Sequence, residues 1–164
     1  RTEGAQIGPL ITSQAFKKVE EHVEDAVEKG AKILTGGTND NSGVQFYKPT
    51  VLTDINNNMK IYYEETFGPV APIIKFKDEN EVIEMANDTK YGLAGYFYSR
   101  DIGKIWRVAE ALEYGMVGIN AGVISTEVAP FGGIKESGIG REGAEEGIEE
   151  YLEIKYLCFD GVEK

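Results

Sequence analysis

The sequence has little of the material from which disulfides, metal sites and membrane spans are built. Cys158 is its one cysteine and His22 its one histidine. A lone cysteine cannot close an internal disulfide and suits a reducing compartment, so we expect a cytoplasmic protein. A lone histidine forms neither a metal cluster nor a catalytic dyad, so we predict no metal site and a structural or surface role for His22.

Long apolar runs are also missing. No stretch of about 18 apolar residues occurs, which argues against a membrane-spanning helix. The N-terminus lacks the order of charged, apolar and small residues that marks a signal peptide. We therefore expect no association with a membrane.

Positive charge is scarce. Lys and Arg total 17 against 28 Asp and Glu, which gives a formal net charge of −11. Because neutralising phosphates requires a local surplus of Lys and Arg, this balance argues against a nucleic-acid partner. The acidic residues cluster on segments with a helical pattern, which is typical of solvated helix faces.

What is present describes an ordinary globular chain. Its 164 residues are 41% hydrophobic, enough for one compact domain with a core of its own. Between residues 13 and 29, apolar residues recur at three- and four-residue spacing and predict a helix. Ser13 is its expected N-cap and Gly30 its expected stop.

Extended segments follow this helix. Residues 31–35 predict a short strand, and residues 38–43 predict a polar loop. Residues 44–52 resume extended structure, and Pro49 within them favours an edge strand over a central one.

The second half alternates strands and helices. We expect strands at residues 70–76, 93–98 and 116–119, and helices that begin at a capping box of Asp78 with Glu81 and at an Asp101 cap. This order predicts an α/β fold with a mostly parallel sheet covered by helices. Residues 151–159 also alternate apolar and polar side chains, and such a strand needs a pairing partner from this chain or another.

Residues 138–143 match the dinucleotide fingerprint G-x-G-x-x-G letter for letter. The fingerprint requires an apolar strand directly before it, which aims a helix N-terminus at the pyrophosphate. Residues 133–137 are not such a strand. We therefore interpret the match as a tight loop that enters a short helix at residues 143–150.

The segment Glu64-Glu65-Thr66-Phe67-Gly68-Pro69 allows two interpretations. Paired acids before an aromatic residue are most often a solvated turn. A carboxylate can also accept two hydrogen bonds from a ribose diol, while a neighbouring aromatic ring supports a flat nicotinamide. The residues alone leave both possibilities open.

Together with residues 130–142 (Pro-Phe-Gly-Gly-Ile-Lys-Glu-Ser-Gly-Ile-Gly-Arg-Glu), this segment resembles the C-terminal half of the catalytic domain of NAD(P)-dependent aldehyde dehydrogenases. The resemblance extends over essentially the whole chain. It implies that residues 1–150 are part of that catalytic domain and that residues 151–164 form an oligomerisation strand and tail. It also implies NAD or NADP as cofactor and a homodimer or homotetramer.

The resemblance implies roles for four residues. Glu65 matches the glutamate that binds the nicotinamide ribose, and Phe67 matches the phenylalanine beside the nicotinamide. Several stretches are most similar to succinate-semialdehyde dehydrogenases. In that subfamily a serine at the place of Ser125 bonds the distal carboxylate of the substrate, and Phe131 matches an aromatic residue of the substrate tunnel.

The family's own nucleophile and base are not among these residues. In aldehyde dehydrogenases a cysteine in a Gly-Gln-x-Cys motif attacks the aldehyde, and a glutamate in a Glu-Leu-Gly-Gly motif activates water. Neither motif occurs here, and Cys158 lies in the terminal strand pattern. We therefore expect no catalytic residue in this chain and no activity of the chain alone. The alternative is a non-catalytic assembly or binding module of the same fold.

Overall fold

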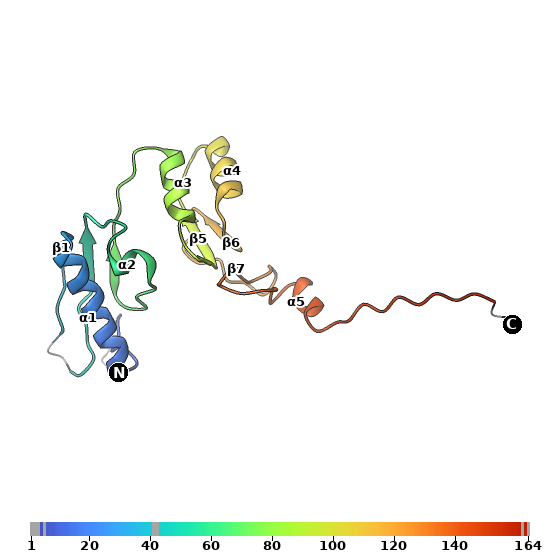
Figure 1. Ribbon diagram of the computed structural model, residues 1–164, viewed down its shortest axis with the longest axis horizontal. Helices are drawn as coiled ribbons and strands as arrows, with labels where there is room; N and C mark the ends of the chain where they lie inside the picture. Colours follow the sequence, from blue (N-terminus) through green and yellow to red (C-terminus); the bar gives the residue numbers. More distant parts are fainter. Residues whose placement is uncertain (1–3, 5, 41–42, 162, 164) are drawn as a thin grey trace. The chain divides into compact units, whose positions relative to one another are not determined.

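The computed structural model describes residue 4, residues 6–40, residues 43–161 and residue 163. The chain divides into two compact units, Arg1–Phe76 and Lys77–Lys164. The first, unit 1, contains α1 (Ser13–Glu28), β1 (Lys32–Thr35), β2 (Thr50–Thr53), α2 (Lys60–Tyr63) and β3 (Val70–Pro72). The second, unit 2, contains α3 (Glu79–Asn87), β4 (Tyr91–Gly92), β5 (Ala94–Phe97), α4 (Ile102–Ala111), β6 (Met116–Ile119), β7 (Ile134–Lys135) and α5 (Glu146–Glu149) (Figure 1).

The α/β class is confirmed, but the strands form three small sheets instead of one mostly parallel sheet. In unit 1 the strand order is β1-β2-β3, with β1 antiparallel and β3 parallel to β2. In unit 2, β5 and β6 pair in parallel around α4, and β4 pairs with β7 in an antiparallel bridge.

The first helix confirms its sequence pattern with one correction. Its N-cap is Thr12, not Ser13, because Thr12 holds the extended backbone and its hydroxyl accepts from the amide of Ala15 at 3.1 Å. The buried face of α1 supplies much of the core of unit 1, which also includes Tyr47, Leu52 and Met59. Burial raises the pKa of Tyr47 to about 12, with Glu20 and Glu24 adding to the shift.

The edge-strand prediction for residues 44–52 is wrong. The strand β2 begins at Thr50 and is central in its sheet. Pro49 lies just before it, so its missing N–H falls outside the ladder and does not interrupt the pairing. The polar loop predicted at 38–43 lies partly outside the described residues.

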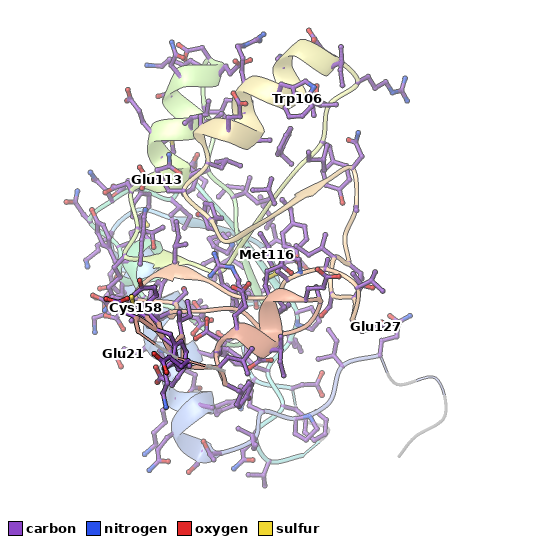
Figure 2. All side chains as sticks on the ribbon, turned by 90° about the vertical axis from the view of Figure 1, so that its right-hand side faces the viewer. Glu21, Trp106, Glu113, Met116, Glu127 and Cys158 are labelled. Atoms are coloured by element: carbon purple, nitrogen blue, oxygen red, sulfur yellow. The ribbon has the colours of Figure 1, made fainter. Side chains whose placement is uncertain are left out.

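Two helices of unit 2, α3 and α4, start where their caps predict, whereas the short helix predicted at 143–150 covers only Glu146–Glu149. Asp78 accepts from the amide of Glu81 at 3.0 Å, and Asp101 accepts from the amide of Lys104 at 3.1 Å. The capping box is shifted by one residue, because the Glu81 carboxylate returns to the amide of Lys77 and not to that of Asp78. Trp106 on α4 is exposed (Figure 2).

The terminal strand is not formed. Residues 152–160, all of them described, continue as extended chain after α5 (Figure 1) and belong to no sheet. Their large apolar side chains are exposed, and so is Cys158. An extended segment becomes a strand only when a second strand supplies its hydrogen bonds. Pairing of this segment between subunits therefore stays a prediction.

Candidate functional site

A loop between α2 and β3 carries the first pair of candidate residues. Residues 64–68, which we call the 64–68 loop, leave α2 in extended conformation at Glu64. The far end of the loop is fixed by the amide of Thr50, which donates to the carbonyl of Pro69 at 2.8 Å. Both ends of the loop are therefore held by regular structure.

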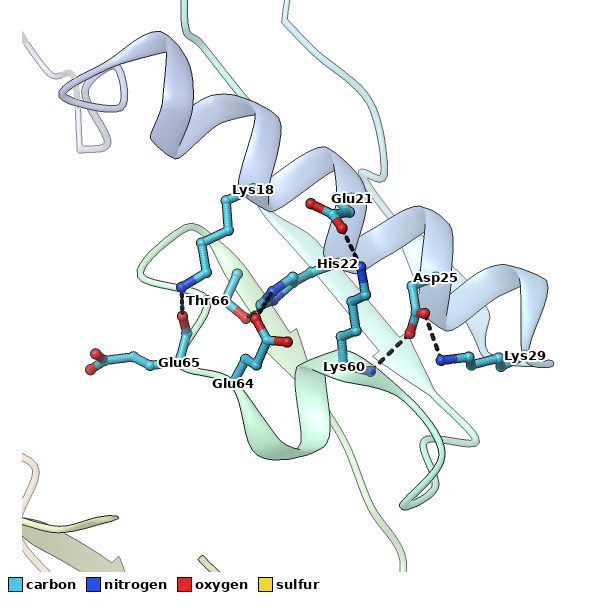
Figure 3. A network of polar contacts seen from close by, with 9 residues as sticks. All are labelled: Lys18, Glu21, His22, Asp25, Lys29, Lys60, Glu64, Glu65 and Thr66. Atoms are coloured by element: carbon cyan, nitrogen blue, oxygen red, sulfur yellow. Dashed lines mark hydrogen bonds and ion pairs between the residues drawn. The ribbon is translucent and has the colours of Figure 1, made fainter. Parts of the chain in front are cut away.

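The two adjacent glutamates have different surroundings (Figure 3). The Glu64 carboxylate lies 3.3 Å from Nε2 of His22. The side chain of Glu65 points away from this cluster, and its carboxylate has no hydrogen bond or ion pair to any residue that the structure describes. Glu65 bonds α1 through its backbone carbonyl, which accepts from Nζ of Lys18.

Phe67 lies at the surface of this loop. Its side chain is 80% exposed, and its backbone is left-handed, with φ at 51°. A bulky residue rarely adopts this conformation, since its Cβ crowds the following carbonyl. Such strain gathers at ligand-binding sites, where the surrounding structure over-determines it. Glu65 and Phe67 thus present a carboxylate and an aromatic ring from one loop.

The loop rests on α1. Gly68 has no room for a side chain, because a Cβ there would lie 2.4 Å from Cγ2 of Val19. Six residues further along α1, the Asp25 carboxylate accepts from the first amide of α2, that of Lys60, at 2.8 Å. Asp25 therefore caps the start of α2, the short helix from whose other end the loop departs.

Ion pairs surround this contact between α1 and α2 (Figure 3). The Lys60 ammonium binds the Glu21 carboxylate, which lowers the pKa of Glu21 and raises that of Lys60. The hydrogen bond from Lys29 lowers the pKa of Asp25. All of these pairs are near the surface, so each contributes little to stability by itself. The Lys60–Glu21 pair joins the two helices, whereas the Lys29–Asp25 pair links residues four apart at the end of α1.

The second candidate pair lies in unit 2. Asn120 follows β6 in left-handed conformation and clamps the end of β5, since its amide group accepts from the N–H of Ser99 at 2.9 Å and donates to the carbonyl of Ser99 at 2.8 Å. The loop that carries Ser125 starts there. Ser125 is exposed, and its hydroxyl makes no hydrogen bond within the described chain.

Phe131 closes the same loop and is half-buried. Its N–H and carbonyl exchange hydrogen bonds of 2.7 Å with Glu142. Phe131 lines a cavity of about 790 Å³ whose wall is formed largely by residues 137–144, but Ser125 is not part of that wall. The two residues lie on one connection without sharing a cavity.

The glycine-rich match at residues 138–143 is a structural loop. The carboxylate of Glu150 fills the space at Gly140, where an added Cβ would lie 2.5 Å from its carboxyl carbon. Arg141 donates to the carbonyls of Gly133 and Gly140. A phosphate would meet a carboxylate here, and the helix that follows, α5, has only four residues.

The role of α1 in holding the 64–68 loop was not foreseen. His22 and Lys18 lie more than 40 residues before their partners, at sequence separations of 42 to 47. A helical pattern shows which residues share a face, but not which distant loop that face meets. No local signal in the sequence identifies these contacts.

Two absences hold for the part of the chain that the structure describes. No group of three or more His, Cys, Asp or Glu side chains there could hold a metal ion. None of the helices in that part of the chain is both long and apolar enough to cross a membrane.

Comparison with known proteins identifies the class to which this α/β chain belongs. The model of the aldehyde dehydrogenase family matches residues 1–157. This chain belongs to the aldehyde dehydrogenase family.

Curated relatives are similar over nearly the whole chain. Succinate-semialdehyde dehydrogenase [NADP(+)] of Escherichia coli K12 is 61% identical over 155 residues, which are 94% of this chain and 32% of the relative. Glutarate-semialdehyde dehydrogenase of Pseudomonas aeruginosa is 60% identical over 159 residues, 97% of this chain and 33% of the relative. 3-Sulfolactaldehyde dehydrogenase of Pseudomonas putida is 56% identical over 161 residues, 98% of this chain and 33% of the relative.

A solved structure agrees with this. The succinate-semialdehyde dehydrogenase of Burkholderia pseudomallei superposes with a TM-score of 0.93 at 59% identity, covering 96% of this chain and 33% of that structure. The chain thus spans about a third of the length of the relatives it matches.

Proposed function

We propose that this chain is the C-terminal part of an NAD(P)+-dependent enzyme that oxidises an aldehyde with an anionic group at its far end, and that succinate semialdehyde is the substrate. The observation that carries the proposal is the 64–68 loop, which carries both the exposed ring of Phe67 and the Glu65 carboxylate, a group that bonds no other residue described by the structure.

The residues of the loop fit a nicotinamide riboside. The two oxygens of a carboxylate can each accept a hydrogen bond from one hydroxyl of a ribose. The exposed ring of Phe67 offers a flat apolar surface next to that position. In this account Glu65 orients the ribose and Phe67 supports the nicotinamide, which, when bound, accepts a hydride. Whether the cofactor is NAD or NADP depends on residues outside this chain.

Three relatives support the anionic substrate class. They are named for succinate semialdehyde, glutarate semialdehyde and 3-sulfolactaldehyde. Each of these compounds has a carboxylate or sulfonate away from the aldehyde. In the present chain the exposed hydroxyl of Ser125 can donate to such a group, and Phe131 contributes an apolar wall.

The remaining parts of the proposal concern the chain as a whole. The chain alone is inactive, because the cysteine nucleophile and glutamate base of the family are supplied by the rest of the enzyme. Assembly into a homo-oligomer proceeds through residues 151–159. The exposed thiol of Cys158 suits the reducing conditions of the cytoplasm.

Replacing Ser125 in the complete enzyme tests the substrate assignment. A hydrogen bond to a charged carboxylate contributes about 1.5–3 kcal/mol, and about 1.4 kcal/mol is a factor of ten. Ser125→Ala should therefore lower kcat/KM for succinate semialdehyde by roughly 10- to 100-fold, measured as the appearance of reduced cofactor.

Butanal is the matched control substrate, since it has the same chain length and no carboxylate. Its kcat/KM should change much less in the same variant. If Ser125→Ala leaves the preference for succinate semialdehyde over butanal unchanged, the substrate assignment falls and the family assignment remains.

A further inference from the structure

One face of α1 supports the 64–68 loop. Lys18 and His22 are four residues apart and Val19 lies between them, so all three side chains project from the same side of the helix. Lys18 donates to the carbonyl of Glu65, Val19 lies against Gly68, and His22 lies between two other residues of the loop.

His22 contacts the two neighbours of Glu65. Its Nδ1 lies 3.1 Å from Oγ1 of Thr66, and its Nε2 lies 3.3 Å from Oε2 of Glu64 (Figure 3). The His22 side chain is 1% exposed. In an extended segment successive side chains point to opposite sides. Holding Glu64 and Thr66 against α1 therefore directs the side chain between them, that of Glu65, away from the helix.

The carboxylate fixes the direction of one of these bonds. An ionised carboxylate only accepts, so Nε2 carries the hydrogen that is donated to Glu64. The Thr66 hydroxyl can both donate and accept, so it pairs with Nδ1 whether or not that nitrogen carries a hydrogen. One imidazole thus bonds two polar side chains of the loop, which a purely apolar side chain of similar size cannot do.

We propose that His22 is a positioning residue for cofactor binding. By fastening Glu64 and Thr66 to α1, it sets the direction in which the Glu65 carboxylate meets the nicotinamide ribose, without touching the cofactor. The inference rests on the proposed role of Glu65 and extends it to a helix outside the motif.

The test compares cofactor binding among variants of the complete enzyme. His22→Leu removes both bonds at similar volume. His22→Asn keeps an amide near the place of Nδ1, and His22→Gln keeps one near the place of Nε2. The dissociation constant of NAD+ or NADP+ is measured by titration, alongside KM for succinate semialdehyde and the melting temperature.

Val23→Ala is the control for stability. Val23 is buried on the same helix, so its truncation destabilises α1 by opening a cavity but removes no hydrogen bond to the loop. His22→Leu should weaken cofactor binding by roughly tenfold, from the loss of two hydrogen bonds. His22→Asn and His22→Gln should each recover part of that loss, and Val23→Ala should bind the cofactor as the unchanged enzyme does.

The outcomes separate the two proposals. If His22→Leu weakens cofactor binding no more than Val23→Ala does, His22 is only a core residue and the inference is overturned. Should His22→Leu fail to fold, unchanged binding in both amide variants overturns it equally. Glu65→Gln is measured in parallel. If it binds and turns over the cofactor normally, the proposed role of Glu65 fails and the inference with it, whereas a defect in Glu65→Gln without one in the His22 variants removes the inference alone.

Discussion

At the scale of residues, the 64–68 loop shows how adjacent identical side chains acquire different surroundings. Glu64 lies beside His22, whereas the Glu65 carboxylate points away and bonds none of the described residues. The difference arises from the alternation of the backbone and not from the residue type. Two residues after Glu65, the backbone of Phe67 leaves the extended conformation, with a left-handed φ of 51°.

The strain at Phe67 predicts an inverted order of stability. Glycine adopts a left-handed backbone freely, whereas alanine there costs about 1–2 kcal/mol. Phe67→Gly should therefore be more stable than Phe67→Ala by about 1 kcal/mol in urea unfolding, although both remove the same ring. Both should weaken cofactor binding in the complete enzyme.

The usual order, with alanine more stable than glycine, would show that Phe67 is not strained in solution. Because the ring is mostly exposed, its removal alone should cost little buried area.

Some residues of this loop and its support are predictable from the sequence, and others are not. The paired glutamates and the aromatic residue stand in one short motif, so Glu65 and Phe67 could be named as candidates from the sequence. A structural role for His22 could be predicted from the sequence. Its contacts with Glu64 and Thr66 could not, because these residues lie more than 40 positions away and no local pattern relates them to His22.

At the scale of elements, the close packing of α1 against the loop depends on the absence of a side chain at Gly68. An added Cβ would lie 2.4 Å from Cγ2 of Val19, and Val19 is fully buried. Interiors are packed too densely to absorb such an overlap without cost. We therefore expect substitutions at Val19 and Gly68 to affect stability in a coupled way.

A double-mutant cycle tests this pair. Gly68→Ala should destabilise the chain by about 1–3 kcal/mol through overpacking, and Val19→Ala by about 2 kcal/mol through a cavity. Together they should cost about 1 kcal/mol less than their sum, because the new methyl group enters the space left by the valine. The free energy of unfolding of the four chains is the measurement.

Strict additivity would mean that Gly68 and Val19 do not touch in solution. Val23→Ala in place of Val19→Ala is the control, since its cavity should give no relief.

The elements also show where local signals suffice. Each long helix begins at a Thr or Asp cap, and the caps of α3 and α4 were predicted to the residue because capping involves neighbours in sequence. The pairing of strands joins distant residues, and so neither the central place of β2 nor the division into three sheets could be predicted. Pro49 favoured an edge strand, but it lies one residue before β2 and does not interrupt the pairing of that strand.

At the scale of the whole molecule, the terminal segment is the part without a partner in the described chain. Tyr151, Ile154 and Tyr156 are each at least 84% exposed. Several exposed apolar side chains close together are unfavourable in water and typical of a surface that another chain covers.

Removing this segment predicts a loss of assembly. A complete enzyme that ends before Tyr151 should sediment at a lower mass than the full-length enzyme and melt at a lower temperature, because strand pairing between subunits is lost. Unchanged oligomeric mass and stability would show that the segment is not an interface. Glu153→Gln, a change within the segment that keeps its apolar residues, should leave the mass unaltered.

The most direct test of the central claim compares the two adjacent glutamates in the complete enzyme. Single-turnover hydride transfer is followed with succinate semialdehyde and with butanal. Glu65→Gln should slow transfer roughly tenfold or more with both aldehydes, because an amide has one acceptor oxygen for the ribose diol where the carboxylate has two. Glu64→Gln should stay near the normal rate, since its amide oxygen still accepts from His22. Normal hydride transfer in Glu65→Gln, or a larger defect in Glu64→Gln, would contradict the account.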